Sequence, residues 1–141
     1  MALAEDAAAR LSPGEGETLL LVEDEEAARE AMADVLEGLG YRVICASNGR
    51  QGLELYQEHA DQIRLVISDM VMPELGGEGL LEELMRRRPG LPMVLMTGYP
   101  VGGTGQLQSA KGIIRLQKPL SMDALAAGVR RALERQGEPA P

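Results

Sequence analysis

The chain has 141 residues, a formal net charge of −8, and 45% hydrophobic but only 2% aromatic residues. This length suits one domain with an aliphatic core, and the acidic balance argues against direct nucleic-acid binding, which needs a basic patch. The sequence offers no signal peptide and no run of about 18 apolar residues that could span a membrane, so we expect a cytoplasmic protein with no membrane insertion.

Residues 1–17 are rich in Ala, Gly and acids and contain a Ser-Pro-Gly break, which predicts a flexible linker. The domain itself is expected at 18–136, followed by a tail at 137–141. Five short apolar runs predict its strands, at 18–22, 41–45, 65–68, 93–96 and 112–116. Such continuous runs are typical of parallel strands buried on both faces. The single cysteine, Cys45, lies in the second run and is predicted to be buried.

Longer amphipathic stretches follow the runs and predict helices. One starts near Asn48, another covers about 77–88, and the last begins after the N-cap Ser121. The place of the fourth helix holds three glycines within 100–105, each costing about 1 kcal/mol relative to Ala, so this helix is predicted to be short or irregular. Five strand–helix units in this order predict an open, doubly wound parallel sheet with helices on both faces.

Polar residues stand where four of the predicted strands end. Glu23 and Asp24 follow the first strand, Asp69 ends the third, Thr97 ends the fourth and Lys118 follows the fifth. Ligands of such sheets bind beyond the carboxyl ends of the strands, so we expect these groups to converge. Clustered carboxylates repel one another unless a cation compensates, and their oxygens suit Mg²⁺, with Mn²⁺ as an alternative. A metal, an ammonium and a hydroxyl around a nucleophilic carboxylate form an arrangement for phosphoryl transfer.

Each of these residues also has an ordinary interpretation when taken alone. Acids at 23–25 are favoured at a helix N-terminus by the helix dipole, and Lys118 can be a surface lysine; the joint placement is the stronger signal. A flavodoxin-type cofactor module shares the topology but needs a phosphate-cradling loop where these acids stand. An aspartate-nucleophile phosphatase needs a second acid two residues after Asp69, where this chain has Val71.

From Thr18 to about Gln136 the sequence resembles the receiver domains of bacterial response regulators, especially those associated with hybrid histidine kinases. The matching segments are LLLVEDEE at 19–26, VISDMVMPELGG at 66–77, VLMTGY at 94–99 and LQKPL at 116–120. The resemblance implies a flavodoxin-like five-stranded sheet in the order 2-1-3-4-5. It also implies a signalling protein rather than an enzyme, with only self-catalysed aspartyl phosphorylation and dephosphorylation. The implied partner is a histidine kinase or histidine phosphotransfer protein, and the chain can be part of a larger hybrid kinase.

By position, the resemblance makes Asp69 the phosphoacceptor and gives Thr97 and Lys118 contacts to the phosphoryl group. It implies that Mg²⁺ is held by the side chains or main chain of four residues: Glu23, Asp24, Asp69 and, through its backbone carbonyl, Val71. The peptide bond before Pro119 is expected to be cis, as in similar domains.

Two departures from the family pattern concern the output. Arg115 stands three residues before the lysine, where similar receivers carry Tyr or Phe, and a guanidinium is costly to bury. The fourth-helix region is also rich in glycine. The main hypothesis is therefore a phosphorylation-dependent signalling receiver. The alternative is a phosphate sink, or a phosphorylation-independent protein-binding module with an atypical switch at Arg115.

Overall fold

Five parallel strands form one central sheet in the order β2-β1-β3-β4-β5. The computed structural model describes residues 16–70, 76–98, 113–119 and 121–134. The strands are β1 (Thr18–Val22), β2 (Arg42–Ala46), β3 (Ile63–Asp69), β4 (Met93–Thr97) and β5 (Ile113–Gln117). This is the predicted flavodoxin-like order, with the first strand next to the third and the second at one edge.

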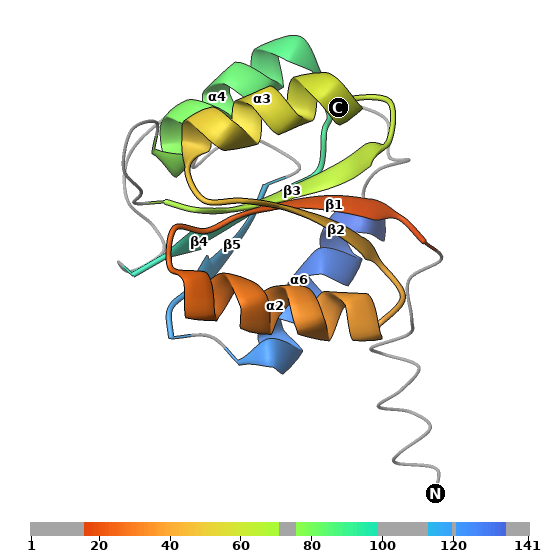
Figure 1. Ribbon diagram of the computed structural model, residues 1–141, viewed down its shortest axis with the longest axis vertical. Helices are drawn as coiled ribbons and strands as arrows, with labels where there is room; N and C mark the ends of the chain where they lie inside the picture. Colours follow the sequence, from red (N-terminus) through yellow and green to blue (C-terminus); the bar gives the residue numbers. More distant parts are fainter. Residues whose placement is uncertain (1–15, 71–75, 99–112, 120, 135–141) are drawn as a thin grey trace, which may run out of the picture.

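Helices cover both faces of the sheet, as predicted (Figure 1). They are α2 (Glu26–Gly38), α3 (Gly49–His59), α4 (Gly77–Arg87) and α6 (Met122–Glu134). The pair α3 and α4 lies on one face, and the pair α2 and α6 lies on the other. The predicted irregular fourth helix falls at 100–105, outside the described residues. None of the helices in the described ranges is long and apolar enough to cross a membrane.

The core consists of two predominantly aliphatic clusters, one on each face of the sheet. Successive residues of β1 point to opposite faces, so Leu20 joins the cluster under α3 and α4 while Leu21 joins the one under α2 and α6. All five residues of β1 are buried, and so are all five of β4. The central strands are therefore fixed from both sides, which holds their carboxyl ends in place.

The sequence-based boundaries agree closely with the structure. The run at 18–22 coincides with β1, and β2, β4 and β5 lie within one residue of their predicted positions. The predicted N-cap Ser121 is also present, since its hydroxyl accepts a hydrogen bond from the Ala124 amide at 3.0 Å. Asn48, near which a helix was predicted to start, caps α3: its side chain accepts a hydrogen bond from the Gln51 amide at 2.8 Å.

The prediction that Cys45 is buried is wrong, because its side chain is exposed. Cys45 lies in β2, which is at the edge of the sheet and has a neighbouring strand on one side only. Of the five residues of β2, only Ala46 is buried. An apolar run in the sequence indicates a strand, but it does not indicate whether that strand is central or at the edge of the sheet.

Helix α3 approaches β1 closely at Gly52, just below the candidate site. A β-carbon added at Gly52 would lie 2.9 Å from Cγ2 of Val22, the residue that precedes Glu23. Val22 is fully buried and β-branched, so it cannot move aside easily. Glycine at this position therefore lets α3 pack against the strand that delivers Glu23.

Substituting Gly52→Ala is expected to destabilise the protein by about 1–2 kcal/mol, because overpacking outweighs the better helix propensity of alanine. Urea unfolding monitored by circular dichroism measures the change. Gly38→Ala is the matched control: it is also helical, but an added β-carbon there meets nothing within 4 Å. Equal or greater stability of Gly52→Ala relative to wild type contradicts the close approach.

Candidate functional site

Side chains from four strand ends meet at one rim of the sheet. Glu23 follows β1, Asp69 is the last residue of β3, Thr97 is the last of β4, and Lys118 follows β5. Glu23, Asp69 and Thr97 are buried. The Lys118 amide donates a hydrogen bond of 2.7 Å to the carbonyl of Thr97, so the ends of β4 and β5 are joined through the main chain. The structure thus places these four predicted residues on the same rim.

Three carboxylates come together at this rim. Glu23, Asp24 and Asp69 each offer an oxygen atom, and these atoms all lie within 4.8 Å of one another. Asp24 is exposed, whereas Glu23 is 1% and Asp69 is 7% exposed. The predicted acidic cluster is therefore present, open to solvent on the side of Asp24.

The Glu23 carboxylate is held from the main chain. Its Oε2 accepts a hydrogen bond from the Glu25 amide at 3.0 Å, while its carbonyl accepts one from Arg29 Nη1 at 2.9 Å. The other carboxylate oxygen, Oε1, is buried and accepts no hydrogen bond from the described part of the chain. Hard cations take such oriented, desolvated oxygens as ligands, so the donor set fits a divalent ion of the Mg²⁺ type.

Burial is the largest influence on Glu23 and raises the pKa of its carboxyl above the ordinary value of 4.5. The negative charge of Asp69 acts in the same direction, while the Glu25 amide and the Lys118 ammonium lower the pKa. The net result is a raised pKa, so the ionised form of Glu23 is disfavoured in the folded protein. An additional cation at the rim would favour the ionised form and so offset the free-energy cost of burying it.

Lys118 bridges the two buried carboxylates. Its Nζ lies 2.6 Å from Asp69 Oδ2 and 3.5 Å from Glu23 Oε1. Burial alone lowers the pKa of Lys118, but the hydrogen bond and charge of Asp69, together with Glu23, outweigh it and raise the pKa above 10.5. Lys118 is therefore a fixed positive charge at neutral pH, beside one oxygen of Asp69.

Some site features were not foreseen, and one lies outside the described residues. The sequence did not predict the role of Arg29, which donates a hydrogen bond to the Glu23 carbonyl and so holds the turn after β1. A cation in the first turns of a helix has no distinctive sequence pattern.

Val71, the predicted carbonyl ligand, falls in the range 71–75, which the structure does not describe. The bond between Lys118 and Pro119 is cis, as the resemblance implied.

Arg115 is partly buried on β5, opposite Leu95 of β4. Its Nη2 atom is buried and has no hydrogen-bond partner among the residues that the structure describes. A guanidinium nitrogen without an acceptor is unfavourable in such surroundings. The position at which the resemblance led us to expect Tyr or Phe is thus occupied by a half-buried charged group.

Comparison with known proteins identifies the family of this site. Residues 19–130 match the family model of the response regulator receiver domain. The chain belongs to this family. Receiver domains are signalling modules of two-component systems and not classical enzymes, so this chain is a signalling receiver. The converging carboxylates and lysine lie within the matched residues.

The relatives of this receiver agree with that conclusion. Sensor kinase CckA of Brucella abortus (strain 2308) is 37% identical over 120 residues, which cover 84% of this chain but 13% of that kinase. A receiver domain protein of Clostridium thermocellum has a TM-score of 0.77 at 28% identity, with 84% of this chain and 95% of the other covered. The receiver domain of hybrid histidine kinase CckA has a TM-score of 0.70 at 33% identity, with 82% and 98% covered. The receiver thus spans a small part of the full-length kinase that it matches.

Replacing Glu23 by Gln is expected to raise the melting temperature of the magnesium-free protein at pH 7, because ionised Glu23 is disfavoured by burial. A carboxyl with a raised folded-state pKa does not lower stability below its unfolded pKa of 4.5, and its full cost is reached as the pH rises through the folded-state pKa. The gain should therefore fade as the pH falls through the raised pKa toward 4.5, because Glu23 takes up a proton in the folded protein. Thermal unfolding in EDTA over a series of pH values measures both effects.

The control for this substitution is Glu30→Gln, which removes the same charge from an exposed position on α2. It should change the melting temperature little at any pH, since exposed charges contribute little to stability. A melting temperature of Glu23→Gln below that of wild type at pH 7 would contradict the interpretation of Glu23 as a costly buried charge.

Proposed function

We propose that this receiver accepts a phosphoryl group on Asp69, from the phosphohistidine of a histidine kinase or histidine phosphotransfer protein, in a Mg²⁺-dependent reaction in the cytoplasm. One observation carries the proposal: the buried Asp69 carboxylate stands beside two further carboxylates and 2.6 Å from the Lys118 ammonium. Phosphoryl transfer needs a positioned nucleophile and positive charge to neutralise the transferring oxygens, and this arrangement can supply both.

The chemistry is a displacement at phosphorus. Lys118 binds Oδ2 of Asp69, which leaves Oδ1 as the attacking atom. A bond forms between Oδ1 and phosphorus while the bond from phosphorus to the histidine nitrogen breaks, and the nitrogen keeps the electron pair. Lys118 and Thr97 contact the oxygens of the transferred group in this proposal. Their contribution is positioning and charge neutralisation, which dominate the catalysis of this reaction class.

Mg²⁺ would be held by Glu23, Asp24 and Asp69, with the Val71 carbonyl as a further ligand outside the described residues. When bound, the ion neutralises charge on the oxygens of the transferring group. The support comes from the three oxygens within 4.8 Å of one another and from the buried Glu23 Oε1, which lies 3.5 Å from Lys118 Nζ but accepts no hydrogen bond within the described ranges. The same donor set suits Mn²⁺.

The phosphoryl donor comes from outside the described fold. The chain has one histidine, His59, which is the last residue of α3 and pairs with Glu58 at 3.9 Å. Helix α3 starts after the carboxyl end of β2, so its last residue lies toward the opposite end of the sheet from Asp69. A kinase or phosphotransfer protein, as a separate molecule or as a neighbouring part of a hybrid kinase, supplies the phosphohistidine. Water later hydrolyses the aspartyl phosphate.

Incubation with acetyl phosphate and Mg²⁺ is expected to add one phosphoryl group to the wild-type chain, detected by intact mass spectrometry. Asp69→Asn removes the nucleophile and should give no adduct, and EDTA should abolish the adduct in wild type. Asp61→Asn is the control, because Asp61 is an exposed acid outside the acidic cluster. An adduct that forms equally on Asp69→Asn, or equally without Mg²⁺, contradicts the proposal.

The second candidate function, a phosphate sink or a binding module that does not respond to phosphorylation, is favoured by one observation. Arg115 carries a buried Nη2 without a hydrogen-bond partner in the described ranges, at the position where receivers that switch usually carry an aromatic residue. Hydrogen exchange of β4 and β5, measured with and without beryllofluoride and Mg²⁺, separates the two. Altered protection of the β4 and β5 amides would support a receiver that changes conformation on phosphorylation. Unchanged protection, in a beryllofluoride complex shown to have formed, would support a phosphate sink or a binding module that does not respond to phosphorylation.

A further inference from the structure

The turn between β1 and α2 is held by three hydrogen bonds that all involve Glu23. The Glu23 amide donates to the carbonyl of Ala46, at the end of β2, at 3.0 Å. Its side-chain Oε2 accepts from the Glu25 amide at 3.0 Å, and its carbonyl accepts from Arg29 Nη1 at 2.9 Å. Of these three bonds, only the last is made by the side chain of another residue, so Arg29 is the partner that a substitution can remove.

The carbonyl that Arg29 binds belongs to the peptide unit between two acids of the cluster, Glu23 and Asp24. A peptide unit is planar, so the orientation of this carbonyl sets the direction in which the chain enters Asp24. Glu23 is buried at the end of a core strand, whereas Asp24 is exposed, so packing does not hold it. The bond from Arg29 therefore holds the stretch of main chain that carries both carboxylates.

Ordinary helix energetics do not account for this arginine. Arg29 is the fourth residue of α2, and the helix dipole disfavours a cation near a helix N-terminus. Glu25 and Glu26 precede it by one turn, yet Arg29 forms no ion pair with any residue that the structure describes. Its half-buried side chain is directed to a main-chain carbonyl instead. The N-cap residue Glu25 makes no capping bond through its side chain, so the Arg29 bond is also part of what fixes the start of α2.

A geometric role of Arg29 and an electrostatic one predict opposite changes in metal binding. Burial raises the pKa of the Glu23 carboxyl, and the charges that also act on it are those of Asp69 and Lys118. A positive charge near the rim would oppose the binding of a metal cation, because like charges repel. Removing the arginine should strengthen metal binding if only its charge matters. It should weaken metal binding if its hydrogen bond positions the ligands.

We propose that Arg29 is a positioning residue for the Mg²⁺ site, which keeps the Glu23 and Asp24 carboxylates directed at one ion by holding the peptide unit between them. This inference rests on the metal site of the proposed function and adds to it a residue that does not touch the ion. Residues that hold metal ligands in place commonly change metal affinity about tenfold or more when they are removed. Arg29 thus governs the Mg²⁺ concentration at which the site fills.

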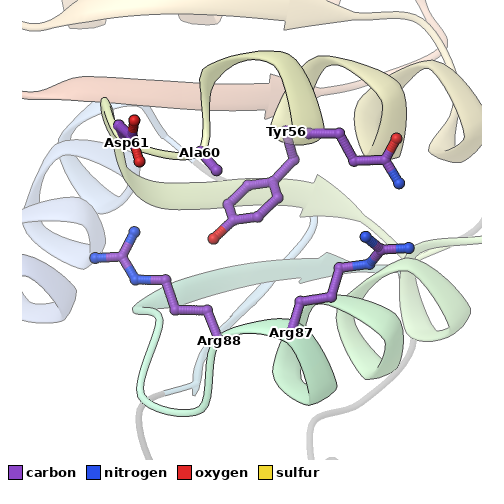
Figure 2. Close-up of a pocket in the computed structure, with 6 residues that line it drawn as sticks. Tyr56, Ala60, Asp61, Arg87 and Arg88 are labelled. Carbon is purple, nitrogen blue, oxygen red and sulfur yellow. The ribbon is translucent and has the colours of Figure 1, made fainter.

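Two other arginines serve as matched controls. Arg88 is half-buried like Arg29 and makes the same kind of bond, because its Nη1 donates to the Ile63 carbonyl at 2.7 Å. It lines the cavity between α3 and α4 (Figure 2). Ile63 is the first residue of β3, about 20 Å from Asp69 at the other end of that strand. Arg50 is exposed in the first turn of α3, which begins after the carboxyl end of β2, so its charge lies at the same end of the sheet as the rim.

Isothermal titration calorimetry of the full chain with Mg²⁺ tests the proposal. Arg29→Met keeps an unbranched apolar stem but removes the donor, and it is expected to weaken Mg²⁺ binding about tenfold. Arg29→Lys keeps a donor on a side chain of different shape and should weaken binding about threefold. Arg88→Met and Arg50→Met should bind Mg²⁺ as tightly as wild type or slightly more tightly, because each loses a positive charge without disturbing the rim. In the acetyl phosphate reaction, the Mg²⁺ concentration that gives half the maximal rate should rise by the same factor in Arg29→Met.

The outcomes separate this inference from the proposed function. Unchanged or tighter Mg²⁺ binding by Arg29→Met would overturn the role of Arg29 and leave the metal site intact. An equal loss of affinity in Arg88→Met would overturn it too, because any destabilising change would then weaken binding. A wild-type chain that binds no Mg²⁺ up to about 10 mM would contradict the metal site itself, and this inference with it. Circular dichroism checks the folding of each variant, and if Arg29→Met does not fold, the affinity of Arg29→Lys decides.

Discussion

The contact between Lys118 and the buried carboxylates is the interaction on which the candidate site depends. One ammonium lies 2.6 Å from Asp69 and 3.5 Å from Glu23, while Asp24 adds a third carboxylate at the solvent edge. Buried ions are tolerated only when they are paired, and three negative charges against one positive charge leave the rim short of a cation. The pKa of Glu23 is raised, chiefly by burial and in addition by the negative charge of Asp69. A divalent ion would neutralise this excess negative charge, so that an incoming phosphoryl group would meet a rim without net repulsion.

The fold delivers this arrangement through strand order. Placing β1 beside β3, and β4 and β5 beyond it, brings four carboxyl ends to one rim, while β2 stays at the edge and contributes no site residue. Two aliphatic clusters hold the central strands from both faces, and the close approach at Gly52 fixes the strand that ends before Glu23. A site that needs accurately placed atoms is thus built on strands that the core holds from both faces.

The strands, most of the helices and the residues at the rim could be predicted from the sequence. Continuous apolar runs indicate buried strands, and ligands of such sheets bind where the strands end. The sequence was not sufficient for what depends on contacts between distant segments. Asp69 and Lys118 are 49 positions apart, so their hydrogen bond could be anticipated only through the fold. The exposure of Cys45 depends on the edge position of β2, and the α3–α4 cavity depends on how two helices pack. The roles of the rim residues in phosphoryl transfer remain predictions.

The most direct test of the rim as a phosphoryl site is ¹⁹F NMR of the protein with beryllium fluoride, which mimics a phosphoryl group on a carboxylate. We predict one set of bound fluorine resonances that appears only when Mg²⁺ is also present and that is absent from Asp69→Asn. No bound resonance in the wild-type protein with Mg²⁺, or the same resonances in Asp69→Asn, would contradict the assignment of Asp69 as the acceptor.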